Sequence, residues 1–250
     1  MIVILAYLAA IAVAETLGIY LNVIMGVIAE LILIIILVIH FSYRRSIPYQ
    51  RVLPVLLLAP LLHILSVTLP TPQIPKIYWY ALVGTPLLIA AALTVRLLGL
   101  SKSQLGFAFP LKTPQFVIAL SGLPLSGAAF FILRPAALFE GFNWPAILIS
   151  SIILSIFVGF AEEFLFRGLF YRVASDVFGA TAAVLCSSLL FATMYIGSLS
   201  LAYLCFMAIV GLFFGYCVKK TGSIGGVILA HSVMTIGQIV IWPSVVASLR

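Results

Sequence analysis

Charged side chains are scarce in this sequence. Only 8% of its 250 residues are Asp, Glu, Lys or Arg, whereas 64% are hydrophobic. A soluble domain has about a quarter charged and about half apolar residues. So few charges cannot cover a water-facing surface, which excludes an ordinary soluble globular protein.

Polar breaks between the apolar runs are also few and short. Roughly 20 mostly apolar residues in a helix cross a bilayer, and lipid leaves the backbone no outside partner. The runs are long and continuous instead of short and alternating, which excludes a transmembrane barrel. The sequence predicts an all-α polytopic helix bundle of eight or nine spans, eight if the barely polar link 18–21 does not separate the first two. The nine expected spans are 2–18, 22–42, 52–69, 77–96, 116–133, 146–166, 180–196, 201–218 and 224–242.

Cysteine is rare too. Cys186, Cys205 and Cys217 are odd in number, lie in apolar runs and form no C-x-x-C pair. This excludes a disulfide framework and a cysteine metal site, so we expect small buried side chains. No Lys or Arg precedes Arg44. Because a secretory signal begins with a basic region, we expect the first span to be retained.

The basic residues lie singly or in pairs at the ends of apolar runs. The net charge of +7 therefore indicates membrane topology and not a nucleic-acid partner. With a cytoplasmic N-terminus, the nine-span model puts ten of the 13 basic residues on the inner side and Lys76, Arg134 and Arg250 on the outer side. The inner ten are Arg44, Arg45, Arg51, Arg96, Lys102, Lys112, Arg167, Arg172, Lys219 and Lys220. Trp79, Trp144 and Trp242 then fall at outer span ends, where interfacial tryptophan is expected.

The longest polar stretch, 101–115, predicts a boundary between two parts of the chain. We expect an N-terminal transmembrane bundle over 1–115 and a functional domain over 116–250. In the second part, Asn143-Trp144-Pro145 predicts a helix start, with Asn as the cap and Pro in the first turn.

Two adjacent acids in an apolar run, Glu162 and Glu163, are the main candidates for chemistry. Ionisable groups are costly inside a membrane and often functional there. Glu163 is four residues before Arg167, so the two share a helix face and can pair, whereas Glu162 points about 100° away. Burial favours the protonated form of such an unpaired carboxyl, which can then exchange protons as a general base. The alternative is an ion-pair cluster that only joins helices.

His231 is the other polar candidate, about 10 Å from the inner end of the last span, with Thr235 on the same helix face. Because Glu162 and Glu163 also lie near the inner end of their predicted span, we expect these groups and Arg167 to line one inward-facing cavity. His231 alone could equally be a hydrogen-bonded interhelical histidine.

Other polar or small residues are expected to be structural. Glu15 and Glu30 are interpreted as polar contacts between helices, and His40 and His63 stand alone without an assigned role. Gly211-x-x-x-Gly215 predicts close helix packing.

Together these residues resemble the CPBP family of intramembrane proteases, which includes the CAAX prenyl endopeptidase and the Abi bacteriocin-immunity proteins. The family pattern is E-E-x-x-x-R, then F-x-x-x-H, then H-x-x-x-N or H-x-x-x-D. Glu162-Glu163…Arg167 matches the first motif completely, and the run from Gly211 into His231 resembles the approach to the third. The resemblance covers roughly 116–242.

Two positions depart from the family pattern. Tyr195 stands in the second motif, Phe191-Ala192-Thr193-Met194-Tyr195, where the family has histidine, and Thr235 stands where it has Asn or Asp. The resemblance implies that the first glutamate and the second-motif histidine activate water, and that the third-motif pair binds the oxyanion or a metal. A phenol is no base at neutral pH but donates a hydrogen bond. The span model also puts Tyr195 near the outer end of its helix, away from Glu162, whereas the family arrangement would bring it to the site. Either that helix starts later or tilts, or Tyr195 is not a site residue.

The resemblance implies an endopeptidase that cleaves membrane-anchored peptides or proteins by glutamate-activated water. Glu162 is then the base, Glu163 and Arg167 orient it, and His231, Thr235 and Tyr195 are the oxyanion donors. No cofactor is required on this mechanism, and zinc is disfavoured because it usually takes three or four protein ligands. The expected location is a prokaryotic plasma membrane. The alternatives are a catalytically silent scaffold or immunity protein and a small transporter.

Overall fold

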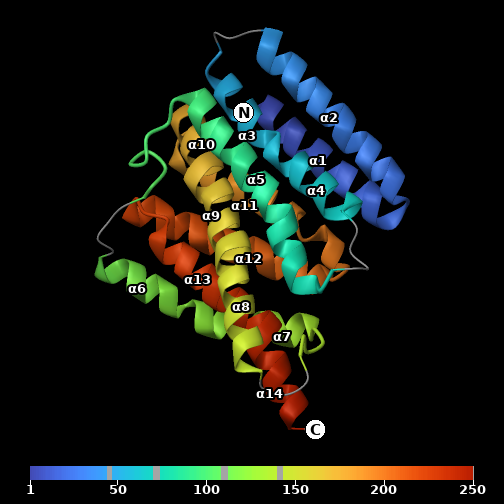
Figure 1. Cartoon of the computed structure of the whole chain (residues 1–250). Helices are drawn as coiled ribbons and strands as arrows, with labels where there is room; N and C mark the ends of the chain where they lie inside the picture. Colours follow the sequence, from blue (N-terminus) through green and yellow to red (C-terminus); the bar gives the residue numbers. More distant parts are fainter. Residues whose placement is uncertain (44–46, 70–73, 108–111, 140–142, 250) are drawn as a thin grey trace.

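Helices form nearly all of the part of the chain that the computed structural model describes, namely residues 1–43, 47–69, 74–107, 112–139 and 143–249. No strand occurs in these ranges, which confirms the all-α fold class. Nine helical segments in them are long and apolar enough to cross a bilayer, so the chain is a multi-pass integral membrane protein. Figure 1 shows the bundle, with the segment of α8 to α10 running through its middle.

The N-terminal helices are α1 (Ile2–Tyr20), α2 (Val23–Tyr43), a 3-10 turn (Pro48–Val52) with α3 (Leu53–Leu56) and α4 (Leu58–Thr68), and α5 (Lys76–Leu98). After them come α6 (Thr113–Leu120) and α7 (Gly122–Leu133), which form one span. The rest of the chain contains α8 (Trp144–Leu154), α9 (Ala161–Glu163), α10 (Tyr171–Phe178), α11 (Ala180–Thr193), a 3-10 turn (Ile196–Ser198), α12 (Leu201–Thr221), α13 (Gly225–Ile236) and α14 (Trp242–Ser248).

The sixth span is longer than predicted. It runs from Trp144 to Phe178, 35 residues, and not to 166. The predicted end was wrong because α10 is amphipathic: Val173 and Ala174 are buried, while Arg172 and Asp176 on other faces are not. Its beginning was predicted correctly, since the Asn143 side chain accepts a hydrogen bond from the Ala146 amide at 3.1 Å.

Three π-helical stretches interrupt the C-terminal helices. Ser155–Phe160 and Phe164–Phe170 flank α9, which carries both glutamates, and Gly237–Ile241 lies between α13 and α14. In a π turn the amide bonds five residues back, so the turn is wider, and such turns are frequent at functional sites. The glutamates therefore sit on a short α-helical piece between two widened turns.

Glycines allow two close helix crossings. A Cβ on Gly26 of α2 would lie only 2.8 Å from the Gly18 amide nitrogen of α1. A Cβ on Gly159 would lie 2.9 Å from the Ser232 nitrogen of α13. Neither position has room for a larger side chain. The second crossing brings α13 against the segment that leads into Glu162.

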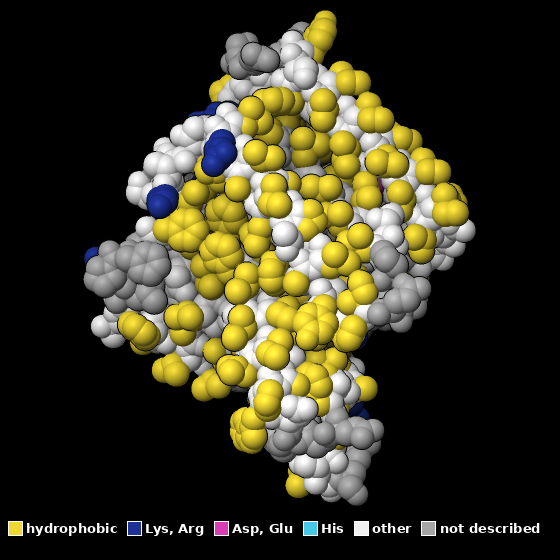
Figure 2. Space-filling view, in the orientation of Figure 1, with side chains coloured by type: hydrophobic (Ala, Val, Ile, Leu, Met, Phe, Trp, Pro, Cys, Tyr) yellow, Lys and Arg dark blue, Asp and Glu magenta, His cyan; other side chains and the backbone are white. Residues whose placement is uncertain are grey.

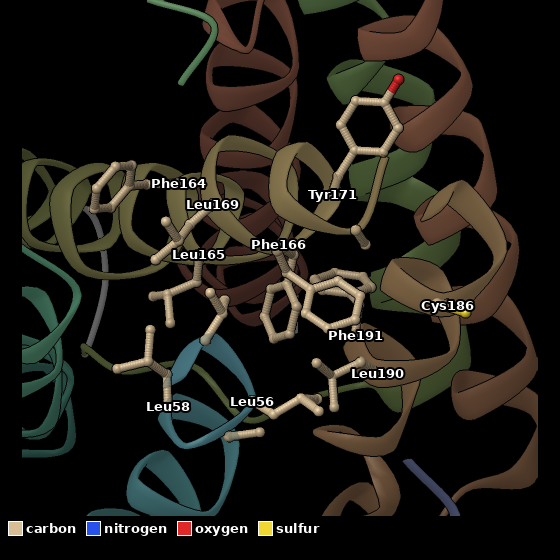
Figure 3. Packing of buried hydrophobic residues seen from close by; sticks show 14 of the residues in the cluster. Leu56, Leu58, Phe164, Leu165, Phe166, Leu169, Tyr171, Cys186, Leu190 and Phe191 are labelled. Carbon is tan, nitrogen blue, oxygen red and sulfur yellow. The ribbon is translucent and has the colours of Figure 1, made fainter. Parts of the chain in front are cut away.

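One hydrophobic core joins the N-terminal helices to the rest. Figure 3 shows Leu56 and Leu58 packed near Leu165 and Phe166, with Leu190 and Phe191 of α11 beside them. α1 also packs against α11, and α3 against Phe164–Phe170. The division into 1–115 and 116–250 stays a prediction, and part of the stretch on which it rests, 108–111, lies outside the described residues.

The surface agrees with a lipid environment. On the face shown in Figure 2, hydrophobic side chains cover most of the surface, and only a few Lys or Arg side chains appear, near its edges. On α2, Ile24, Ile35 and Ile39 are all more than half exposed. Of the cysteines, Cys186 and Cys217 are buried as expected, whereas Cys205 is exposed.

Candidate active site

The predicted ion pair lies at the centre of the bundle. Arg167 Nη1 donates to Glu163 Oε1 at 2.8 Å, and both side chains are 0% exposed. Glu162 points elsewhere, as the helix geometry predicts. The pair is therefore fully removed from lipid and water, where removing one partner leaves the other charge uncompensated.

Arg167 is held by three neighbouring segments. Its Nη2 donates to the Gly211 carbonyl oxygen at 3.2 Å, and its guanidinium lies 4.1 Å from the centre of the Phe191 ring. Gly211 also lets α12 approach α11, because its missing Cβ would lie 3.2 Å from Phe191 and Ser188 atoms. The G-x-x-x-G segment thus packs helices and supplies an acceptor for the buried cation.

His231 joins this pair from α13. Its Nδ1 lies 2.8 Å from Glu163 Oε1, and its Nε2 lies 3.9 Å from Glu162 Oε2. The imidazole is 0% exposed, and Nε2 has no hydrogen-bond partner among the described residues. One carboxylate oxygen of Glu163 therefore serves both Arg167 and His231.

Glu162 is the acid that faces open space. Its side chain is 20% exposed, and the Tyr195 hydroxyl donates to its Oε2 at 2.7 Å. This hydrogen bond agrees with the family arrangement, which brings Tyr195 to the site, and not with the span model, which put it away from Glu162. Because the sixth span continues to Phe178, Glu162 lies near its middle and not near its inner end, level with the end of α11.

Two cavities meet at Glu162 and Tyr195. One, of about 420 Å³, also has His231 and Thr235 in its wall, and we call it the polar chamber. The other, of about 320 Å³, we call the apolar chamber. Its wall consists of Glu15, Ile19, Leu62, His63, Ser66, Val67, Trp79, Tyr80, Val83, Gly84, Leu87, Phe157, Val158, Glu162, Met194, Tyr195 and Gly197.

The prediction that both glutamates, Arg167 and His231 line one cavity was partly wrong. Glu162 and His231 do line the polar chamber, but Glu163 and Arg167 are buried behind them. The chamber wall includes Lys76 and Ser198, which the nine-span model puts on the outer side. The expectation of an inward-facing cavity therefore conflicts with the distribution of basic residues.

Sequence reasoning missed several polar residues around these chambers. In the polar chamber, the Tyr203 hydroxyl donates to Gln238 Oε1 at 3.0 Å. Gln238 is seven residues after His231, two turns further on, and could have been noticed as a polar residue on that face. Tyr80 lines both chambers but gives no signal in an aromatic-rich helix.

Both histidines that were expected to stand alone, His40 and His63, have partners. His63 Nδ1 lies 2.5 Å from Glu15 Oε2, so α1 and α4 share a buried acid–histidine pair. His40 lies 2.8 Å from the Tyr7 hydroxyl and 3.2 Å from that of Tyr49. The first pair joins α1 to α4, and the contacts of His40 join α2 to α1 and to the 3-10 turn Pro48–Val52.

The donor set near Glu162 does not fit a metal held by protein ligands. In the described ranges no group of three or more His, Cys, Asp or Glu side chains is arranged to hold an ion. His231 has one nitrogen engaged with Glu163, and Glu163 is already paired with a guanidinium. Zinc usually takes three or four protein ligands, so we derive no step through a metal.

The protein is thus a multispanning helix bundle. Its apolar core contains an acid–histidine–arginine cluster beside an internal cavity, which is the class of membrane protein with an ionisable site inside the bundle. Residues 136–237 match the model of a family described as type II CAAX prenyl endopeptidase Rce1-like. The match confirms the family resemblance and implies an intramembrane protease fold. No curated protein and no solved structure matches the chain. Glu15, His63 and Tyr80 lie outside the matched segment.

Proposed function

We propose that this protein is an intramembrane endopeptidase that hydrolyses peptide bonds of membrane-anchored peptides or proteins. The observation that carries this proposal is the position of Glu162. Its carboxylate faces both chambers, accepts from Tyr195, and lies 3.9 Å from an unpartnered nitrogen of His231.

His231 is oriented to accept a hydrogen bond from water. A carboxylate can only accept hydrogen bonds, so where Glu163 is paired with Arg167 the proton of a neutral His231 belongs on Nδ1. Nε2 then carries a lone pair on the side of Glu162. This differs from the donor role expected from the sequence, and it supplies a nitrogen that holds the water beside the general base Glu162.

The proposed reaction is hydrolysis by activated water. A water held between Glu162 and His231 gives a proton to Glu162 as its oxygen attacks the substrate carbonyl carbon. Thr235 is a hydroxyl donor available to the resulting oxyanion, and Tyr195 becomes a second one when its hydroxyl turns away from Glu162, which has by then been protonated. When the intermediate collapses, the C–N bond breaks and Glu162 returns the proton to the leaving amine.

The apolar surroundings favour this chemistry. In an apolar cavity, hydrogen bonds and charges act more strongly than in water, and their donors are already in place. We also propose a prokaryotic plasma membrane with the N-terminus in the cytoplasm, and on that topology Lys76 and Ser198 in the wall of the polar chamber lie on the outer side. Substrates then enter from that side or from its leaflet.

The test is cleavage of a panel of membrane-anchored peptides by purified protein in liposomes. We expect the wild type to cleave at least one peptide, and Glu162→Gln to reduce the rate by roughly 10²–10⁴-fold, because the amide cannot take up the proton. Glu30→Gln is the matched control, since Glu30 is a buried acid that lines neither chamber. Cleavage that continues unchanged in Glu162→Gln would refute the glutamate mechanism.

A second candidate is a catalytically silent relative that acts as a membrane scaffold or immunity protein. One observation favours it: the Tyr195 hydroxyl already satisfies Glu162 Oε2, where the family pattern has a histidine. The same panel distinguishes the peptidase from the silent relative. A silent protein cleaves no peptide under conditions in which a family member with the complete motif cleaves at least one.

A further inference from the structure

The apolar chamber has a second acidic group at a distance from Glu162. Glu15 and His63, 4% and 5% exposed, contribute to its wall from α1 and α4. Apart from the contact with His63, Glu15 has no hydrogen-bond partner among the described residues, and His63 Nε2 has none. These groups retain unused hydrogen-bonding capacity in a buried position, where an unmade bond costs free energy.

Apart from His63, the ionisable side chains that give this chamber its charge are acidic. Two carboxylates, Glu15 and Glu162, line it, and no Lys or Arg of the described ranges is present in its wall. His63 is the one nearby group of this set that can carry positive charge. An anion is therefore disfavoured in the chamber, and a cation or a hydrogen-bond donor is favoured.

The remaining wall is largely aliphatic and aromatic. Leu62, Val83, Leu87 and Phe157 line the same chamber as Glu162 and the Glu15–His63 pair, and Trp79 and Tyr80 add aromatic surface. Such a wall accepts the methylene stem of a long side chain, and a carboxylate accepts its charged end. Lysine has this combination of an apolar stem and a terminal ammonium.

We propose that the apolar chamber is a substrate subsite that binds a long, cationic side chain, with lysine as the fitting amino acid and Glu15 as its carboxylate acceptor. The proposal rests on the function proposed above, because it makes Glu15 a specificity-determining residue of that peptidase. Glu15 and His63 lie outside the matched family segment, so the specificity arises from the N-terminal helices of this chain.

The first experiment measures cleavage of peptides that carry lysine, norleucine or glutamate at each position near the scissile bond. Norleucine keeps the stem of lysine and lacks the ammonium. At one position we expect lysine to be cleaved roughly tenfold faster than norleucine, as for one charge-assisted hydrogen bond, and glutamate to be cleaved slowest. Glu15→Gln should remove the lysine preference and Glu30→Gln should retain it. Equal lysine and norleucine rates at every position, or a preference that survives Glu15→Gln, would overturn the proposal.

The second experiment does not require cleavage, so it separates this proposal from the proposed function. Hexylamine and hexanol have similar stems, and their effects on the melting temperature of the purified protein are compared. We expect hexylamine to stabilise the wild type and Glu162→Gln more than hexanol does, and to lose this advantage in Glu15→Gln. Equal effects of the two compounds on the wild type would overturn the proposal whether or not the protein cleaves peptides.

A third variant covers the case in which Glu15→Gln does not fold. Ser66 lies in the chamber wall and is partly buried, and its hydroxyl only bonds its own helix at the Leu62 carbonyl. Ser66→Lys places a tethered ammonium in the chamber. It should abolish both the lysine preference and the hexylamine advantage, and retention of either would contradict the proposed subsite.

Discussion

Replacing Arg167 should destabilise the protein much more than replacing Glu162. Arg167 is fully buried and bonds Glu163 at 2.8 Å and the Gly211 carbonyl at 3.2 Å. Arg167→Met fills much of the same space but leaves Glu163 as a buried carboxylate whose remaining partner is His231. Glu162→Gln keeps an acceptor for Tyr195 and removes a charge from a partly exposed site.

The expected difference is large on the scale of protein stability. Removing one member of a buried ion pair costs about 3–5 kcal/mol. For a chain of this size, this corresponds to a decrease in melting temperature of about 6–20 °C. Glu162→Gln replaces a hydrogen bond to a charged acceptor by one to a neutral amide oxygen, which changes stability by about 1 kcal/mol. The two variants should therefore separate clearly in a detergent melting experiment.

A double-mutant cycle shows whether the stranded charge is the cause. Glu163→Gln in the Arg167→Met background removes that charge, so the double variant should melt above Arg167→Met alone. Equal losses for Arg167→Met and Glu162→Gln would refute the assigned pairing. A double variant that melts at the sum of the two single losses would refute the stranded-charge explanation.

Two further predictions concern the neighbours of the site. Tyr195→Phe should slow peptide cleavage, because Glu162 Oε2 loses its donor, whereas Tyr195→His should raise the rate because an imidazole exchanges protons near neutral pH; a faster Tyr195→Phe enzyme would contradict the donor role. Gly159→Ala should reduce the yield of folded protein in size-exclusion chromatography, since its Cβ would lie 2.9 Å from the Ser232 nitrogen. Gly127→Ala is the control, with no neighbouring atom nearer than 3.8 Å to its Cβ, and equal yields of the two would show that the crossing at Gly159 can relax.

Features that depend on neighbouring residues were predictable from the sequence. The nine spans follow from apolar run length, and the Glu163–Arg167 pair follows from a spacing of four in a helix. Span ends were less predictable, because the amphipathic α10 continues the helix beyond its apolar part. Because the sixth span was predicted to end too early, Glu162 was expected near its inner end. The span model therefore put Glu162 far from Tyr195, to which it is hydrogen-bonded.

Contacts between distant segments were not predictable. Glu15 and His63 are separated by 48 positions, and no local pattern indicates that α1 and α4 bring them together. The same applies to the chambers, because a cavity depends on side chains from several helices at once. A single sequence shows that each of these polar residues is costly in a membrane, but the packing of the helices decides which polar residues meet.

π-helical stretches lie on both sides of α9. The direction in which the two acids point therefore depends on the number of residues in each turn as well as on residue type. A π turn contains more residues than an α turn for the same advance around the axis. If Ser155–Phe160 kept its six residues and closed into regular α-helix, everything after it would rotate by about 100° relative to α8. Glu162 would then turn away from the chambers although every polar side chain of the cluster was still present. The two acids have distinct surroundings, one facing space and one facing Arg167, because these turns fix the angle at which each leaves the helix.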